Sequence, residues 1–149
     1  MISLRKITEE NFIEAFNLRL NPEQERFVSH PIRSLAQAYV YRDQCQPFGI
    51  YEGETMVGYV MVIYDYDIPE YDIWHMMIAE SNQHRGYGSA ALDLVFDFIK
   101  TKPFGDSNRV ALTCSRDNVH ALNLYKSKGF TESGSVDEDE IELSLLLPV

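Results

Sequence analysis

Two glycines one residue apart, Gly86 and Gly88, lie in the most constraining stretch of the sequence, residues 82–100. After them, apolar residues recur at the spacing of an amphipathic helix that ends before Pro103. The predicted apolar stripe consists of Ala91, Leu94, Val95, Phe98 and Ile99, opposite Asp93, Asp97 and Lys100. Backbone N–H groups at the start of a helix bind phosphate without a cation, and glycines let the phosphate approach closely. The stretch therefore predicts a phosphate-binding loop.

Two common phosphate loops do not explain this glycine pair. The nucleotide-triphosphate loop GxxxxGK[ST] does not occur in the sequence. Residues 86–91 formally satisfy the dinucleotide pattern GxGxx[GA], but the preceding predicted strand ends near Ile78, several residues too early. The next predicted strand ends in Thr113-Cys114-Ser115 and offers no acid for a ribose diol. Both nucleotide-binding classes are therefore disfavoured.

The rest of the chain predicts alternating groups of strands and helices rather than a regular βαβα order. We expect strands over 2–7, 71–78, 109–114 and 141–147, with a further strand before the last. Residues 48–67 are expected to form a hairpin of two strands around the turn Glu52-Gly53-Glu54. We expect a helix over 9–18 with Thr8 as cap, a second within 30–44 with Ser34 as cap, and a third after Asn118 up to Gly129. The acidic turn 135–140 is expected to be a hairpin tip. This order predicts a mixed α/β fold that is not a doubly wound sheet.

Composition limits the class of protein and its partners. A chain of 149 residues with 45% hydrophobic and 24% charged residues is typical of one globular domain, expected to span residues 1–149. A formal net charge of −10 argues against a nucleic-acid binder, because such proteins neutralise phosphates with Lys and Arg. The negative charge favours a cationic partner. The alternative is that the charge only keeps the protein in solution.

The sequence offers no signal for a membrane, a secretory route or a metal. Its longest apolar run, Met56 to Tyr64, is too short to span a bilayer, and the first residues lack a signal-peptide core. Cys45 and Cys114 have no metal-binding or redox spacing, and the four histidines are scattered. We therefore expect a cytoplasmic protein without a metal site.

Two motifs together resemble the GNAT superfamily of acetyl-CoA-dependent N-acyltransferases. The first is Gln83-His84-Arg85-Gly86-Tyr87-Gly88, which matches the family signature [QR]xxGx[GA]. The second is a helix that starts at Asn118 and carries Tyr125 shortly before Gly129-Phe130. The expected element order extends the resemblance over nearly the whole chain. Residues 5–12, 47–61 and the final acidic turn also resemble the polyamine acetyltransferase branch found in Firmicutes.

The resemblance implies a fold and a cofactor. The implied fold is a mixed, mainly antiparallel central sheet flanked by helices and splayed at the cofactor cleft. The implied cofactor is acetyl-CoA as acetyl donor, with its pyrophosphate on the glycine loop and its pantetheine arm along the strand before the loop. The residues carried over as cofactor-binding are Met76, Ile78, Gln83, His84, Arg85, Gly86, Tyr87, Gly88, Ser89, Ala90 and Asn118.

The resemblance also implies an acid, and it suggests a position for a base. Tyr125 matches the tyrosine that protonates the departing thiolate. Asp72 lies where family members often place a carboxylate that helps to deprotonate the amine. His75 is an alternative base, but strand alternation predicts that it faces the opposite side of the sheet from Asp72.

The acceptor is expected to be a primary amine. Residues 64–72 interleave carboxylates with tyrosines, and Asp65, Asp67 and Glu70 are candidates for binding a polyamine or diamine. Another amine, such as a protein N-terminus, an aminoglycoside or an amino-acid analogue, remains an alternative acceptor. A non-catalytic acyl-CoA sensor is a further alternative, and a homodimer is a possible assembly.

Overall fold

The computed structural model describes residues 1–148, and its centre is one seven-stranded sheet. The strands follow the order β1-β2-β3-β4-β5-β7-β6, and every neighbouring pair is antiparallel except β4 and β5. The strands are β1 (Ile2–Lys6), β2 (Cys45–Glu52), β3 (Thr55–Asp65), β4 (Glu70–Ile78), β5 (Arg109–Ser115), β6 (Thr131–Ser135) and β7 (Glu140–Leu146). The predicted mixed, mainly antiparallel sheet is confirmed.

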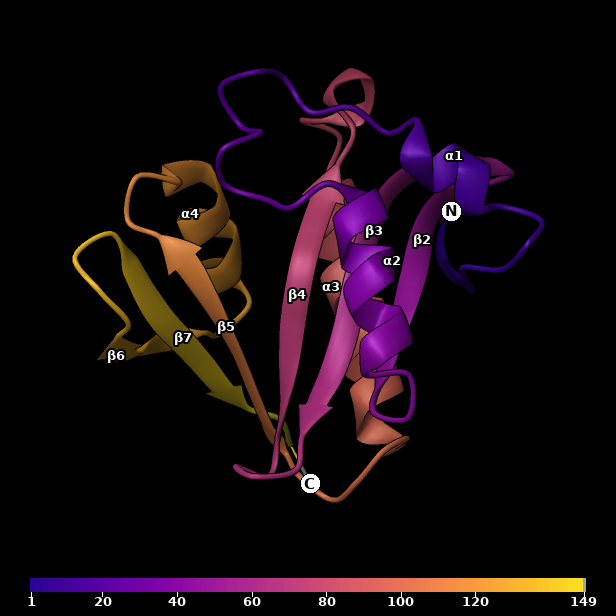
Figure 1. Cartoon of the computed structure of the whole chain (residues 1–149). Coiled ribbons are helices and arrows are strands. Elements are labelled where there is room, and N and C mark those ends of the chain that lie inside the picture. Colours follow the sequence, from indigo (N-terminus) through magenta and orange to yellow (C-terminus); the bar gives the residue numbers. More distant parts are fainter. Residues whose placement is uncertain (149) are drawn as a thin grey trace.

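Helices cover both faces of this sheet. The helices are α1 (Phe12–Phe16), α2 (Pro31–Val40), α3 (Tyr87–Lys100) and α4 (Val119–Ser127), with a short 3₁₀ turn η1 (Glu80–Asn82). In Figure 1, α2 lies in front of β3 and β4, whereas α3 lies behind them. None of the helices in residues 1–148 is long and apolar enough to cross a membrane.

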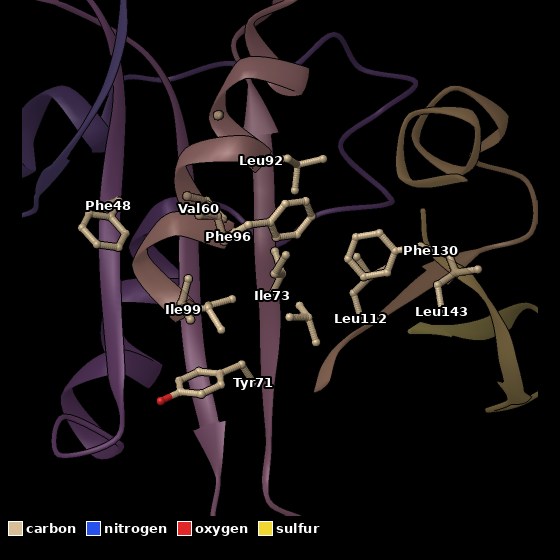
Figure 2. Packing of buried hydrophobic residues seen from close by; sticks show 14 of the residues in the cluster. Phe48, Val60, Tyr71, Ile73, Leu92, Phe96, Ile99, Leu112, Phe130 and Leu143 are labelled. Carbon is tan, nitrogen blue, oxygen red and sulfur yellow. The ribbon is translucent and has the colours of Figure 1, made fainter. Parts of the chain in front are cut away.

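The core on the α3 side joins the two halves of the sheet. Phe96 of α3 points toward Phe130, which follows α4, and their ring centroids lie 6.0 Å apart (Figure 2). The buried face of α3 differs from the predicted stripe, because Leu92 and Phe96 are buried while Leu94 and Phe98 lie at its margin. The helix therefore buries a broad face rather than a narrow seam.

The starts of the first two helices differ from the prediction. Helix α1 starts at Phe12, after Asn11. The Asn11 side chain makes no capping hydrogen bond with the helix but accepts one from the Thr8 amide, which closes the preceding turn. Helix α2 starts at Pro31, and the His30 ring accepts from the Ile32 amide. Proline favours the first position of a helix because it lacks the N–H that would remain unpaired there.

The later turn residues agree with the prediction. Asn118 caps α4, and its side chain accepts a hydrogen bond from the Ala121 amide at 3.4 Å. Gly129 follows α4 with a φ of 102°, a conformation that favours glycine. The acidic turn joins β6 to β7, as expected for a hairpin tip.

The sheet opens between its two parallel strands. β4 and β5 pair over only two positions, Tyr71 with Val110 and Asp72 with Ala111. Beyond these positions the strands diverge, and α4 lies beside the free end of β5 (Figure 1). Since β4 and β5 no longer pair there, their facing edges can bind a ligand.

Candidate active site

The glycine loop ends in a helix start with unusual geometry. Gly86 caps α3 with φ of 79°, and no side chain caps the helix. A Cβ added to Gly88 would lie 3.2 Å from a Leu124 methyl and 4.0 Å from the Met76 methyl. The left-handed backbone at position 86 therefore favours glycine. At position 88, the absence of a side chain leaves space between α3 and α4. The uncapped amides at this helix start suit a bound anion.

A cavity of about 400 Å³ lies between this loop, the end of β4 and α4. Most of the predicted cofactor residues line it, namely Met76, Ile78, Gln83, His84, Gly86, Tyr87, Gly88, Ser89 and Asn118. Arg85 and Ala90 do not line it, and Arg85 is exposed. The structure thus brings together two motifs that lie far apart in the sequence.

The segment between α1 and α2 forms a wall of this cavity that sequence reasoning missed. Leu20, Gln24, Phe27 and Val28 line the cavity, and the segment passes over the end of β4 in Figure 1. The Gln24 and Gln83 side-chain amides exchange two hydrogen bonds, of 3.2 and 2.8 Å. The segment carries no sequence motif that predicts this position, because only the tertiary structure brings it to the cavity.

A second cavity, of about 660 Å³, occupies the gap where β4 and β5 diverge. Ile73, Trp74 and His75 line it from β4, and residues 112–115 line it from β5. The two cavities share Phe27, Val28, Met76, Asn118, Ala121 and Tyr125 as lining residues. The second cavity, called the acceptor cleft below, therefore adjoins the first at Tyr125.

Tyr125 lines both cavities, and Cys114 lines the second one. Tyr125 is half-buried, and its ring packs edge-on against Phe130 with centroids 5.8 Å apart. Burial and the nearby Cys114 raise the pKa of the Tyr125 phenol, so the group stays protonated at neutral pH. Burial and Glu140 raise the pKa of the Cys114 thiol to about 11. Cys114 is therefore a weak nucleophile at neutral pH.

His75 does not lie on the side of the sheet that strand alternation predicted. It adopts a φ of 60°, next to an irregularity in the pairing of β3 with β4, and its Nδ1 lies 2.7 Å from the Ser34 hydroxyl of α2. The Ser34 hydroxyl also lies 2.7 Å from the Tyr59 hydroxyl. The irregularity turns His75 toward α2, so the prediction that it faces away from Asp72 is wrong. Burial, together with Arg33, lowers the pKa of His75 to about 4.

Asp72 lies at the closed end of the gap between β4 and β5. It occupies the last paired position, one residue before Ile73 of the acceptor cleft, and it does not itself line the cleft. Burial, Asp65 and Glu142 raise the pKa of Asp72 to about 7. A carboxyl with this pKa exchanges protons readily at neutral pH.

The predicted substrate carboxylates gather around Asp72 rather than in the cleft. Carboxylate oxygens of Asp65, Glu70 and Asp72 lie within 4.8 Å of one another. Glu70 is buried and forms an ion pair with Arg109. The Asp65 carboxylate accepts a hydrogen bond from the Asp67 amide at 2.8 Å, which closes the β3–β4 turn. Asp67 is exposed in that turn.

Two acidic residues that line the acceptor cleft come from the β6–β7 hairpin. Asp139 lies in its turn and Glu140 is the first residue of β7, and no Lys or Arg is among the lining residues. The sequence placed this acidic turn at a hairpin tip but gave no sign that the hairpin would lie over the gap. The cleft is therefore negatively charged and suits a cationic ligand.

A sheet splayed beside a phosphate loop, with a separate acidic cleft on the other side of a tyrosine, is the architecture of an acyl-CoA-dependent transferase. Comparison with known proteins gives the family: the acetyltransferase (GNAT) family matches residues 3–130. The chain belongs to this family and is a GNAT N-acetyltransferase.

The relatives share the fold at low identity. A spermine/spermidine N(1)-acetyltransferase of Bacillus subtilis is 24% identical, and the match covers 91% of each chain. The spermidine N-acetyltransferase of Vibrio cholerae, solved with CoA and spermine, superposes with a TM-score of 0.79 at 18% identity and covers 97% of this chain and 95% of its own. The ribosomal-protein-S18-alanine N-acetyltransferase of Escherichia coli superposes with a TM-score of 0.75 at 18% identity, covering 100% and 96%.

The acetyl donor is acetyl-CoA, as the sequence resemblance implied. The first cavity fits this cofactor, because the uncapped start of α3 can hold its pyrophosphate and the free edge of β4 can pair with its pantetheine arm. A Cβ at Gly88 would narrow this cavity between Leu124 and Met76. When bound, acetyl-CoA supplies the acetyl group as a thioester.

Proposed function

We propose that this acetyltransferase transfers acetyl to a primary amine of a polyamine or diamine. The observation that carries the proposal is the charge of the acceptor cleft, which is lined by Asp139 and Glu140 and by no Lys or Arg. A molecule with two or more ammonium groups can leave one in this negative region while another reacts. The resemblance to the B. subtilis polyamine acetyltransferase supports the same substrate class.

Direct transfer between donor and acceptor agrees with the layout of the site. The two cavities meet at Tyr125 and Met76, so an amine in one can reach an acetyl group in the other. An acyl-enzyme route would need a nucleophile, and the raised pKa of Cys114 makes that thiol a weak one. We therefore propose a ternary complex in which the amine nitrogen bonds to the acetyl carbon as the carbon–sulfur bond breaks.

Three groups carry the proton transfers and the developing charge in this proposal. An amine with pKa near 10.4 costs about 4 to 5 kcal/mol to deprotonate at pH 7, at about 1.36 kcal/mol per pKa unit. Asp72, with pKa of about 7, receives that proton through water, because it lies just beyond the cleft. The Tyr125 hydroxyl gives its proton to the departing sulfur, and the Met76 amide stabilises charge on the carbonyl oxygen.

A panel of amines tests the proposal. We expect spermidine, spermine and diaminobutane to release thiol from acetyl-CoA well above the hydrolysis background, with acetylated amine as product. A peptide N-terminus, an aminoglycoside and an amino-acid analogue provide the competing acceptors. Faster turnover of one of these would contradict a polyamine substrate. CoA binding without amine-dependent release would instead indicate the sensor function.

A further inference from the structure

His75 lies in a bulge of β4 and lines the acceptor cleft. In the pairing of β3 with β4, Val60 alone lies opposite His75 and Met76. His75 has a φ of 60°, a left-handed conformation that is uncommon outside glycine. Such a conformation persists only where surrounding contacts hold it, so the contacts of the His75 side chain call for an explanation.

Two buried hydroxyl groups hold the His75 imidazole from one side. The Ser34 hydroxyl of α2 is buried and lies 2.7 Å from both the Tyr59 hydroxyl and the His75 Nδ1. Tyr59 is buried too, and within residues 1–148 its hydroxyl has Ser34 as its one hydrogen-bond partner. A buried phenol with an unpaired proton would cost free energy, so Tyr59 donates to Ser34.

The direction of this first hydrogen bond decides where the His75 proton lies. Since Ser34 accepts from Tyr59, its own proton is free for another acceptor. The two acceptors in reach are the His75 Nδ1 at 2.7 Å and the Met61 sulfur at 3.9 Å. A thioether is a weak acceptor, so Ser34 donates to Nδ1. A neutral imidazole that accepts at Nδ1 carries its proton on Nε2.

The Nε2–H of His75 remains available to a ligand in the acceptor cleft. No protein group within residues 1–148 bonds to Nε2, yet this atom is not shielded from solvent. Of the two cavities, His75 lines the acceptor cleft, together with Met76 and Tyr125. Burial and Arg33 lower the pKa of His75 to about 4, so the ring is neutral at pH 7 and is a weak base. The imidazole therefore offers the cleft a neutral N–H donor.

We propose that His75 is a catalytic hydrogen-bond donor: the Tyr59–Ser34 chain keeps its proton on Nε2, and this N–H stabilises negative charge on the acetyl carbonyl oxygen. That oxygen gains an electron pair when the amine nitrogen attacks the carbonyl carbon, and it returns the pair as the carbon–sulfur bond breaks. The His75 proton stays on Nε2 throughout.

The chemistry of the reacting atoms favours this oxygen as the partner of His75. The amine brings N–H donors of its own, and the departing sulfur receives the Tyr125 proton in the proposed mechanism. The carbonyl oxygen is the reacting atom that gains negative charge first, and it can accept from the His75 N–H and the Met76 amide together. The inference rests on the direct transfer proposed above, and it does not depend on which amine is the acceptor.

Two amide side chains separate the two ring nitrogens of His75. The His75→Gln amide nitrogen can occupy the place of Nε2, whereas the shorter amide of His75→Asn reaches only the place of Nδ1. Asparagine also tolerates the left-handed backbone. We expect His75→Asn to slow the acetyl-transfer step about 100-fold or more, and His75→Gln to slow it less than about 10-fold. Single-turnover experiments measure this step, and CoA titration should show little change in Kd. Equal rates in the two variants would overturn the inference.

The dependence of the rate on pH distinguishes a donor from a base. A donor that stays neutral helps equally at each pH, so His75→Asn should lower the rate by the same factor from about pH 6 to about pH 9. Asp72, with its pKa of about 7, is present in both proteins and cancels in this ratio. Burial raises the pKa of Tyr59, so its hydroxyl keeps its proton over this range. A factor that changes with pH would indicate a base at position 75 and contradict the donor role.

Nuclear magnetic resonance tests the hydrogen-bond chain without turnover. Long-range nitrogen–proton correlations in the free protein should place the His75 proton on Nε2. Tyr59→Phe removes the donor to Ser34, which can then accept from Nδ1, so we expect a mixture of tautomers and slower acetyl transfer. The matched control is Tyr51→Phe, which removes a buried hydroxyl that bonds to Asn11 and lines neither cavity. This control should keep the wild-type tautomer and rate.

The outcomes separate this inference from the proposed function. A proton on Nδ1 in the wild type would overturn the inference and leave the proposed function standing. If the panel of amines identifies an acceptor other than a polyamine, the polyamine proposal fails, and the two His75 variants compared with that amine still decide the inference. If no amine is acetylated, the catalytic role of His75 fails together with the proposed function.

Discussion

Tyr125 and Asp72 both have a raised pKa, but the consequences differ because their ordinary pKa values differ. The raised pKa of Tyr125 keeps the phenol protonated throughout the physiological range, as a proton donor requires. The raised pKa of Asp72 brings its titration to about 7, so it can both accept and release a proton. Burial is the largest cause in both cases.

Replacing Tyr125 by phenylalanine should lower kcat about 100-fold or more, because the donor to the departing sulfur is lost. The aromatic packing against Phe130 is retained, so the Kd for CoA should change little. Steady-state kinetics and CoA titration measure the two effects. Tyr39→Phe, at an exposed position of α2, is the control. Wild-type kcat in Tyr125→Phe would remove this residue as the acid.

Replacing Asp72 by asparagine should change how stability depends on pH. The folded chain holds the Asp72 proton up to about pH 7, whereas the ordinary pKa is 3.8. Because the folded chain binds this proton more tightly than the unfolded chain, protonation of Asp72 stabilises the fold. This stabilisation is complete below pH 3.8 and is lost as pH rises through about 7. At pH 8 the variant should therefore be more stable than the wild type by about 2 to 4 kcal/mol, allowing for partial solvent exposure.

Denaturant titrations at pH 4 and pH 8 check this expectation. The difference between the Asp72→Asn variant and the wild type should be small at pH 4 and large at pH 8. Asp67→Asn, in the exposed turn nearby, should show no such difference. Equal stability of Asp72→Asn and the wild type at both pH values would contradict a titration near 7.

More of the residues predicted for the cofactor than of those predicted for the acceptor line one of the two cavities. The glycine loop and the helix with Tyr125 carry local signals, because backbone conformation and capping depend on near neighbours. Asp139 and Glu140 carry no such signal, since only the tertiary structure brings the β6–β7 hairpin to the gap between β4 and β5. His75 was misplaced because an irregularity in strand pairing cancels the alternation rule.

The start of α3 contains two glycines with different structural roles. Gly86 has the left-handed conformation that ends the loop, with open space around a hypothetical Cβ. Gly88 lies inside the helix and faces Leu124 of α4. The sequence pattern predicted the loop, but it did not distinguish these two roles, since only the contact between α3 and α4 reveals the second.

Gly88→Trp should abolish CoA binding, because the indole would fill the cavity between α3 and α4. Isothermal titration of CoA measures the effect, and circular dichroism checks that the chain still folds. Gly134→Trp, on the exposed strand β6, is the control and should bind CoA as the wild type does. Tight CoA binding by Gly88→Trp would refute the phosphate-loop assignment.

The element order was predicted more accurately than the element boundaries. Strands and helices follow the expected sequence from β1 to β7, because their hydrophobic periods are strong. The predicted starts of α1 and α2 were wrong. Helix α1 begins after Asn11 without a capping hydrogen bond from a side chain, and the His30 ring rather than Ser34 caps α2. The splaying of β4 and β5 came only from the family resemblance.

The net charge of −10 on the whole chain attracts cationic molecules over long range. Raising ionic strength from about 0.05 to about 0.5 M should therefore raise the KM for a diamine several-fold, because salt screens exposed charges. A monoamine of similar size should show a smaller rise, since it carries half the charge. Initial rates at several salt concentrations measure both. Equal salt effects on the two amines would contradict this electrostatic contribution.

The short paired region of β4 and β5 affects the order in which the two substrates can bind. Because the strands separate after two paired positions, the cavities proposed for the donor and for the acceptor are separate and share residues around Met76 and Tyr125. Neither molecule has to pass the other on its way in. Random order of addition is therefore expected, and the acetylated product can leave while spent CoA is still bound.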